Sequence, residues 1–443
     1  ATFRRYIDYL IEKRFSLLWA LEGTRSRTGK LLPPRFGLFN YVLESILRTR
    51  LYDVTFIPVS VAYDQITEVD DYSIEQRGQK KKPESITWPL RFLKRGRSRG
   101  QIHLRFGEGL TIRELVKPEA LEAGIDERQK QVLVPTLAFE VAVRMNEATP
   151  ITATSIVTLI LLAGGNRAQS LREIQVPARA GAALIRRRQH EIVGRSDFKD
   201  DNSLQATLAE LHATGIVTYL DEGTERLYAI SEDQHHNAAY YRNTAIHYFI
   251  LDAFVEIALL DAAAAEGDRR EVFFARTRKL RELFKFEFYF PRSADFQPEM
   301  ERRVSDRFDD WEEALQGGTA GVREEFNKMH LLVAHGVLRS FADAYRVAAG
   351  VLAAADADAV TGKSAFISKC LKTGKQELLQ GRVFSAESVS KTLYESGWKL
   401  AEYRGLLGAG MAEERREFHD EFRSMKRQLD EILAITTAQA DQL

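Results

Sequence analysis

The sequence predicts an α/β region over residues 1–150, followed by a mainly α-helical region over residues 151–443. Two observations support this division. Up to Pro150, runs with helical spacing of apolar residues alternate with short β-branched runs, which is typical of a largely parallel α/β sheet. Beyond Pro150 the helical spacing predominates, and glycines divide the chain into separate elements. We therefore place a domain boundary near Pro150.

The α/β region begins with a predicted helix that carries an apolar stripe, and a short buried strand follows it. The remaining elements are two strands and two helices, and the first of these strands contains Pro58. In chain order we predict a helix over 2–15 with Phe3, Tyr6, Ile7 and Leu10 on one face, a strand over 16–21, a helix over 37–50, strands over 54–63 and 101–106, and a helix over 126–147.

A helix over 203–214, followed by two alternating runs around an acidic glycine turn, has the outline of a winged helix-turn-helix. Such domains often bind DNA through a basic recognition helix. Arg186, Arg187 and Arg188 lie upstream, but the predicted helix carries Glu210 and His212 and no basic stripe. The chain also has 63 basic and 63 acidic residues, so its net charge is zero. We expect no nucleic-acid partner.

Apolar residues near the end of the chain recur with coiled-coil-like spacing amid dense mixed charge. This seam consists of Met411, Phe418, Phe422, Met425, Leu429 and Ile432. Packing of the helix onto its own domain is the favoured interpretation. Self-association through residues 411–432 is the alternative.

The composition limits the compartment and the membrane contact. Cys370 is the single cysteine, which excludes an internal disulfide framework and a multi-cysteine zinc site. The longest apolar run, 156–163, is shorter than the roughly 20 residues that span a bilayer. We expect an intracellular protein whose membrane contact is peripheral. A basic run over 80–99 with Trp88 and Phe92 is either a solvated loop or an electrostatic surface for anionic partners.

The most informative stretch is LEGTRSRTGKLLPPRFG, over residues 21–37. A buried strand leads here into a loop with two glycines, hydroxyl groups and several cations. Arginine binds phosphate oxygens in a fork, and glycine lets backbone N–H groups approach an anion. The stretch therefore predicts a phosphate site, with a solvated basic turn as the alternative.

EGTRSRTGK, followed by VTFIPVSVAYD, resembles the third and fourth sequence blocks of the glycerol-3-phosphate acyltransferases, bacterial and mitochondrial. DQITEVDDYSIEQRGQKKKPES and GQIHLRFGEGL are similar to the segments that follow in that family. YYRNTAIHYFI and FKFEFYF resemble its C-terminal domain. The resemblance covers most of the chain.

This resemblance implies which residues bind substrate. The third block would comprise Glu22, Gly23, Arg25, Ser26 and Arg27, with the arginines gripping the phosphate of glycerol 3-phosphate. Lys30 and Arg35 would extend the basic loop, and Pro58 would shape the acyl-donor side of the pocket. The resemblance implies no cofactor and no metal, because acyl-coenzyme A or acyl carrier protein enters as a substrate.

The family's catalytic base is the histidine of an HxxxxD pattern upstream of the third block. The 21 residues before Glu22 contain no histidine, so we assign no catalytic residue in this chain. His247 and Asp252 match the pattern by coincidence, because residues five apart point about 140° away from each other on a helix. His103 is expected to be structural, and His235 and His236, being adjacent, point apart and form no metal pair.

The expected function is that of a glycerol-3-phosphate 1-O-acyltransferase, acting peripherally on the cytoplasmic side of the inner cell membrane at the first step of phospholipid synthesis. Acceptors such as dihydroxyacetone phosphate and lysophosphatidate are alternatives within this class. A non-catalytic lipid- or phosphate-binding regulator that retains half of an acyltransferase fold is the alternative from another class. A winged-helix nucleic-acid binder is the least favoured.

Overall fold

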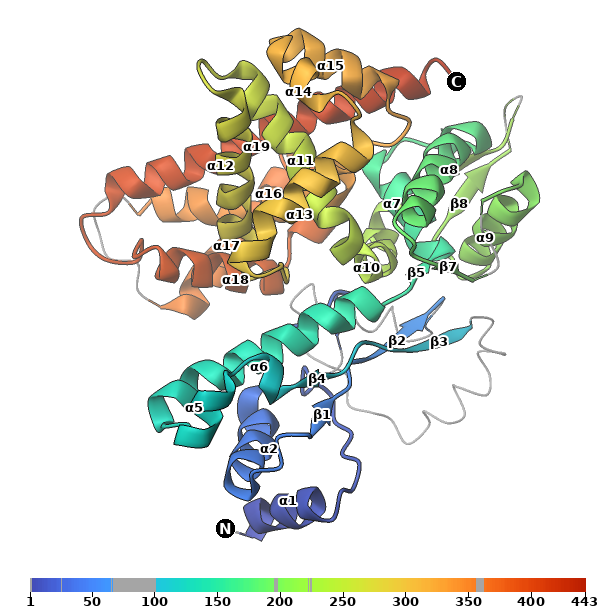
Figure 1. Ribbon diagram of the computed structural model, residues 1–443. Helices are drawn as coiled ribbons and strands as arrows, with labels where there is room; N and C mark the ends of the chain where they lie inside the picture. Colours follow the sequence, from blue (N-terminus) through green and yellow to red (C-terminus); the bar gives the residue numbers. More distant parts are fainter. Residues whose placement is uncertain are drawn as a thin grey trace. The chain divides into compact units, whose positions relative to one another are not determined.

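The computed structural model describes residues 2–24, 26–64, 66, 101–194, 198–221, 223, 225–355 and 362–443. The described residues form two compact units (Figure 1). The first, called the α/β unit below, takes its residues from 1–26, 31–62 and 102–150. The second, the helical unit, takes its residues from 27–30, 63–101 and 151–443. The short stretch 27–30, in the middle of the predicted phosphate loop, thus belongs to the helical unit.

The α/β unit contains helices α1 (Thr2–Glu12), α2 (Phe36–Thr49), α5 (Pro118–Ala123) and α6 (Glu127–Ala148). Its strands are β1 (Thr55–Phe56), β2 (Val59–Tyr63), β3 (Ile102–Phe106) and β4 (Leu110–Thr111). The helices predicted over 37–50 and 126–147 and the strand over 101–106 are confirmed. Asp126 begins α6 with a capping box, in which its side chain accepts a hydrogen bond from the Gln129 N–H while the Gln129 side chain reaches back.

Two predictions for the start of the chain are wrong. Residues 16–21 form no strand, because their backbone is paired with no strand in the described part of the chain and a short apolar run alone does not make a ladder. The predicted stripe on α1 is also displaced. Ile7 and Ile11 are buried there, whereas Phe3 and Tyr6 are exposed.

The strand predicted over 54–63 is divided at Pro58, which has no N–H to donate to a ladder. β1 pairs with β4, and β2 pairs with β3. The first of the four strands thus pairs with the last, and the two middle strands pair with each other. The β1–β4 pair is antiparallel, with Thr55 opposite Thr111. The prediction of a largely parallel sheet is therefore wrong for this pair.

The helical unit confirms the prediction of a mainly helical second region. Its longer helices share one core in which α11 and α16 are buried almost throughout. The helices are α7 (Ala153–Ala163), α8 (Leu171–Arg187), α9 (Asp201–Ala213), α10 (His235–Thr244), α11 (Ile246–Ala264), α12 (Arg269–Phe284), α13 (Ser293–Arg307), α14 (Trp311–Gln316), α15 (Gly318–Lys328), α16 (Ala334–Ala353), α17 (Lys363–Leu379), α18 (Lys391–Tyr403) and α19 (Ala412–Ala440).

Short strands complete the helical unit. β5 (Ile151–Thr152) pairs in parallel with β7 (Ile192–Val193). β8 (Thr218–Leu220) and β9 (Leu227–Ala229) form the predicted hairpin, and β6 (Gln169–Ser170) adds to it in the order β6-β9-β8. The helix predicted over 203–214 corresponds to α9. Assignment of this segment to the winged-helix class stays a prediction.

The apolar seam near the end of the chain lies on α19, which packs along α16 (Figure 1). Phe418, Phe422, Met425, Leu429 and Ile432 are buried there within the chain's own core. Packing of this helix onto its own domain is confirmed, and self-association through residues 411–432 stays a prediction. None of the helices in the described ranges combines the length and the apolarity needed to cross a membrane.

Candidate functional site

The start of the predicted phosphate loop is fixed within the α/β unit. Leu21 is buried, and its carbonyl accepts a hydrogen bond of 2.9 Å from the Arg35 N–H. The Glu22 carboxylate accepts the Leu32 N–H at 3.1 Å, so it closes the loop across ten residues. Gly23 has φ +63°, and a side chain there would meet the stem of Arg35 at 3.0 Å. Glycine is therefore favoured at this turn by its backbone angle, and a larger residue would also have to displace the Arg35 side chain slightly.

The next part of the loop, residues 28–30, is held by the helical unit and is called the anchored segment below. The Asn243 side chain in α10 donates a hydrogen bond of 2.7 Å to the Thr28 carbonyl. Gly29 has φ +83°, and a Cβ atom there would lie only 1.9 Å from the Tyr240 carbonyl oxygen. The segment thus lies directly against the backbone of α10, at a distance that only glycine allows.

Lys30 completes the anchored segment with a buried ion pair. Its ammonium binds the Glu287 carboxylate and donates to the Glu287 carbonyl oxygen at 2.9 Å. Tyr345 in α16 donates its hydroxyl to the same carboxylate at 3.0 Å. Lys30 is only 8% exposed, so this pair is shielded from water. We call Lys30, Glu287 and Tyr345 the Glu287 cluster. Because its ammonium is engaged there, Lys30 is placed as an anchor of the loop.

Asn243 is itself oriented by a second buried ion pair. Arg242 donates to both oxygens of Glu387, at 2.8 and 2.7 Å. The same guanidinium donates to the amide oxygen of Asn243 at 3.1 and 2.8 Å. Because the amide oxygen is thereby used as an acceptor, the amide nitrogen is the group that faces Thr28. Arg242 therefore fixes the direction of the hydrogen bond that holds the loop.

A hollow of about 20 Å³ lies beside the anchored segment, lined by polar side chains that include Thr28, Lys30 and Asn243. A space of this size accommodates about one water molecule. The inner side of residues 28–30 is packed against α10 and α16 around this hollow.

Pro58, the fourth-block residue, is buried between β1 and β2. Its carbonyl accepts the Gly107 N–H at 2.8 Å. Its Cβ would lie 3.3 Å from a Cβ added to Gly107, so the two backbones approach closely. Pro58 thus shapes the turn of the ribbon, and its predicted contact with the acyl donor stays a prediction.

Some of the predicted site lies outside the described residues: Arg25 and the basic run over 80–99, including Trp88 and Phe92. Ser26 and Arg27 are half-buried. Phosphate binding by Glu22, Gly23, Arg25, Ser26 and Arg27 stays a prediction.

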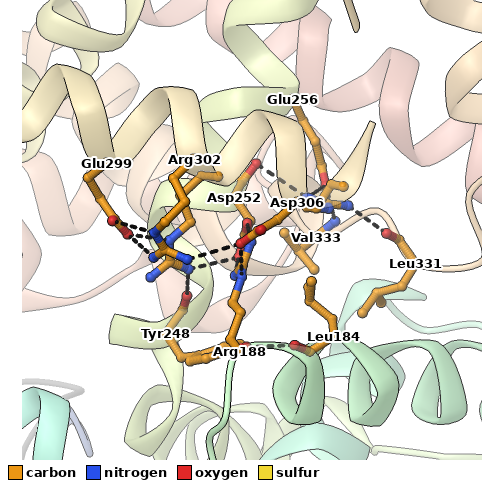
Figure 2. A network of polar contacts seen from close by, with 12 residues as sticks. Leu184, Arg188, Tyr248, Asp252, Glu256, Glu299, Arg302, Asp306, Leu331 and Val333 are labelled. Atoms are coloured by element: carbon orange, nitrogen blue, oxygen red, sulfur yellow. Dashed lines mark hydrogen bonds and ion pairs between the residues drawn. The ribbon is translucent and has the colours of Figure 1, made fainter. Parts of the chain in front are cut away.

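Asp252, the aspartate of the coincidental HxxxxD match with His247, has a structural role. Asp252 in α11 is fully buried and accepts both terminal nitrogens of Arg188 at 2.8 Å (Figure 2). Arg303 in α13 adds a third contact at 3.3 Å. Burial alone would raise the pKa of the Asp252 carboxyl, but these two guanidinium groups hold that pKa below its ordinary value. This carboxylate is committed to structure and does not orient a catalytic histidine.

Arg188 extends this cluster, since its Nε donates to Asp306 at 3.0 Å (Figure 2). We call Arg188, Asp252, Arg303 and Asp306 the Asp252 cluster. The Arg188 side chain is only 3% exposed. Of the three arginines considered as a DNA-binding signal, Arg188 is therefore unable to reach a nucleic acid, while Arg186 and Arg187 are exposed.

His235 and His236 lie in the buried helix α10. The His235 Nδ1 is 3.0 Å from the Ser385 hydroxyl. His335, to which the sequence assigned no role, is buried in α16, and burial together with the nearby Arg339 lowers the pKa of His335 to about 3.

The sequence assigned no role to Asn243 or Glu287, although it singled out the stretches YYRNTAIHYFI and FKFEFYF that contain them. One signal was available. Glu287 is the only acidic residue in an otherwise aromatic and basic run, and a carboxylate in such a run needs a buried cation. The identity of that cation could not be read from the sequence.

The chain is similar to known acyltransferases over most of its length. Residues 72–410 match the family model described as the glycerol-3-phosphate acyltransferase C-terminal region. A Mycobacterium tuberculosis H37Rv protein with the provisional name acyltransferase plsB1 is 34% identical over 445 residues, covering 98% of this chain and 70% of that protein. The same values hold for its Mycobacterium bovis counterpart. A glycerol-3-phosphate acyltransferase of Aeromonas hydrophila is 28% identical over 304 residues, covering 67% of this chain and 37% of that protein.

Proposed function

Since the chain belongs to the glycerol-3-phosphate acyltransferase family, we propose that it transfers a fatty acyl group to the sn-1 hydroxyl of glycerol 3-phosphate. The donor is acyl-coenzyme A or acyl carrier protein, and the reaction is the first step of phospholipid biosynthesis. The hydroxyl oxygen forms an ester bond to the acyl carbon, the C–S bond breaks, and the hydroxyl proton ends on the released thiol. The observation that carries this proposal is the EGTRSRTGK loop, whose first half is fixed by a partly buried hydrogen bond and whose second half is fixed by buried contacts.

Within this proposal the loop residues divide into two roles. Arg25 and Arg27 grip the phosphate, and Gly23 and Ser26 let backbone and hydroxyl donors approach it. Glu22 keeps the loop closed through the Leu32 N–H. Lys30 anchors the loop through Glu287. Pro58 shapes the acyl-donor side. No residue of this chain is assigned as the catalytic base, and no cofactor is required.

We further propose peripheral contact with the cytoplasmic face of the inner membrane. Helix α1 supports this, since Phe3, Tyr6 and Tyr9 are each more than half exposed beside Arg4 and Arg5. Exposed aromatic side chains next to cations are typical of a helix that lies on an anionic surface. Sedimentation with phosphatidylglycerol vesicles, compared with phosphatidylcholine vesicles, tests this contact. Failure of the protein to sediment with either kind of vesicle would refute this contact.

The function is tested by thiol release from palmitoyl-coenzyme A, with and without glycerol 3-phosphate, on the longest coding sequence that contains this chain. We expect release that depends on glycerol 3-phosphate. Arg27→Ala should raise the KM for glycerol 3-phosphate about tenfold or more and change the KM for the acyl donor little, because one charge-assisted phosphate contact is lost. Arg226→Ala, at an exposed arginine of the β8–β9 hairpin, is the control.

Two outcomes would contradict the proposal. Equal increases of both KM values in Arg27→Ala would exclude the phosphate role of this loop. Binding of glycerol 3-phosphate without any acceptor-dependent thiol release would favour the alternative, a non-catalytic regulator that retains half of an acyltransferase fold.

A further inference from the structure

The anchored segment is held at each of its three residues by a different kind of contact. Asn243 binds the Thr28 carbonyl, the α10 backbone lies against Gly29, and Glu287 pairs with the Lys30 ammonium. These contacts connect residues that are 215 and 257 positions apart in the chain. All of them lie within the helical unit.

The contacts that hold the anchored segment are also buried, so water does not compete for them. Thr28 and Lys30 are each 8% exposed, and Asn243 and Glu287 are buried as well. A hydrogen bond or an ion pair without competing water holds a fixed geometry better than the same pair at the surface. Lys30 also lies 5.4 Å from the centre of the Phe288 ring, which leaves the ammonium little freedom.

We propose that Asn243 and Glu287 are positioning residues for the acceptor phosphate: through Thr28 and Lys30 they fix the backbone that presents Arg27. This inference rests on the proposed function. Neither residue touches the substrate. Arg27 directly precedes the anchored segment, so a shift of the Thr28 carbonyl moves the Arg27 backbone with it. A misplacement of about 1 Å in such a group is enough to lower affinity strongly.

Asn243→Asp is the sharpest variant, because it preserves size and can still accept from Arg242 but cannot donate to the Thr28 carbonyl. Asn237→Asp is the matched control. Asn237 is also buried in the same helix, and its amide donates to Gln234. The full chain is used in each measurement. Glu287→Gln is a second variant, which removes the partner charge of Lys30.

The first measurement is hydrogen exchange at the backbone amides of residues 28–32. We expect Asn243→Asp to speed this exchange about tenfold, the effect of one lost hydrogen bond, and Asn237→Asp to leave it unchanged. The second is the KM for glycerol 3-phosphate, which should rise about tenfold while the KM for palmitoyl-coenzyme A changes less than about twofold.

The outcomes distinguish a failure of the positioning role from a failure of the proposed acyltransferase function. Unchanged exchange at residues 28–32 in both Asn243→Asp and Glu287→Gln would overturn the positioning role, whatever the activity. Faster exchange with an unchanged KM for glycerol 3-phosphate also overturns it, because the loop would then not present the acceptor site. A wild-type protein that shows no acceptor-dependent turnover defeats the proposed function, and the exchange result still decides whether Asn243 and Glu287 hold the loop.

Discussion

The Asp252 cluster and the Glu287 cluster both bury a carboxylate against cations, yet they join different parts of the chain. In the Asp252 cluster, Asp252 of α11 connects α13 with Arg188, which follows α8 (Figure 2). In the Glu287 cluster the carboxylate holds Lys30, a residue of the predicted phosphate loop. Loss of the first should loosen the packing of helices, whereas loss of the second should release a loop. One buried carboxylate therefore joins helices of the core, and the other joins a loop to the core.

The largest expected effect is on stability, in Asp252→Ala. This change leaves Arg188 and Arg303 buried without the carboxylate that both of them share. Breaking a buried pair from one side costs about 3–5 kcal/mol in the free energy of unfolding. Urea denaturation followed by far-UV circular dichroism measures this loss. The KM for glycerol 3-phosphate should not change.

The exposed pair between Arg226 and Asp221 provides the control for this prediction, since Asp221→Asn should leave the denaturation midpoint where it is. A raised KM for glycerol 3-phosphate in Asp252→Ala would show that the two clusters are coupled. The distinction between a core cluster and a site cluster would then be wrong.

A smaller effect is expected from Gly29→Ala, which tests how closely the anchored segment is seated. Gly29 and Gly215 have nearly the same backbone angle, φ +83° and φ +79°. Alanine at either position should cost about 1 kcal/mol through this angle. At Gly215 nothing lies within 4 Å of the added Cβ, whereas at Gly29 the Tyr240 carbonyl lies at 1.9 Å. We expect a further loss of about 1–3 kcal/mol for Gly29→Ala alone.

The difference in unfolding free energy between Gly29→Ala and Gly215→Ala measures the effect of the close approach to Tyr240, because both variants carry the same cost from the positive φ angle. Equal losses of unfolding free energy would mean that residues 28–30 can move away from α10 without cost. The anchored segment would then not be held as described.

The sequence was sufficient where structure depends on neighbouring residues. Helical spacing predicted α2 and α6, alternation predicted β3 and the β8–β9 hairpin, and the seam of α19 was readable from its repeats. It was insufficient where a partner was needed from elsewhere in the chain. Residues 16–21 form a short apolar run typical of a buried strand, but no described strand pairs with them.

The same limit applies to the candidate site. The stretch over 21–37 could be predicted as a phosphate loop from its arginines and glycines, because a phosphate needs those groups in one short stretch. Phosphate binding there stays a prediction. The ion pair of Lys30 could not be predicted from the sequence, since its partner Glu287 lies 257 residues away. The burial of Arg188 could not be predicted for the same reason, because its partners Asp252 and Asp306 are distant in sequence.

The smallest expected effect is a dependence of stability on pH through His335, which follows Ala334 at the start of α16. The pKa of His335 is about 3 in the folded protein, because burial and the charge of Arg339 oppose its protonation. In the unfolded chain its pKa is about 6.5. Between these values the unfolded chain binds the proton and the folded protein does not, so acid favours unfolding.

The stability associated with His335 is therefore complete above about pH 6.5 and falls by up to ~1.4 kcal/mol for each pH unit below it, until about pH 3. Between pH 7 and pH 5 this amounts to about 2 kcal/mol. Urea denaturation of wild type and His335→Gln at both pH values measures it, because other titrating groups cancel in the difference. The exchange of amides 28–32 should stay the same in the variant, since the contacts described for residues 28–30 come from Asn243, Tyr240 and Glu287. Parallel pH profiles of the two proteins would show that the pKa of His335 is the same in the folded and the unfolded chain. Faster exchange at 28–32 in His335→Gln would show that the start of α16, and not Tyr345 alone, helps to hold the loop.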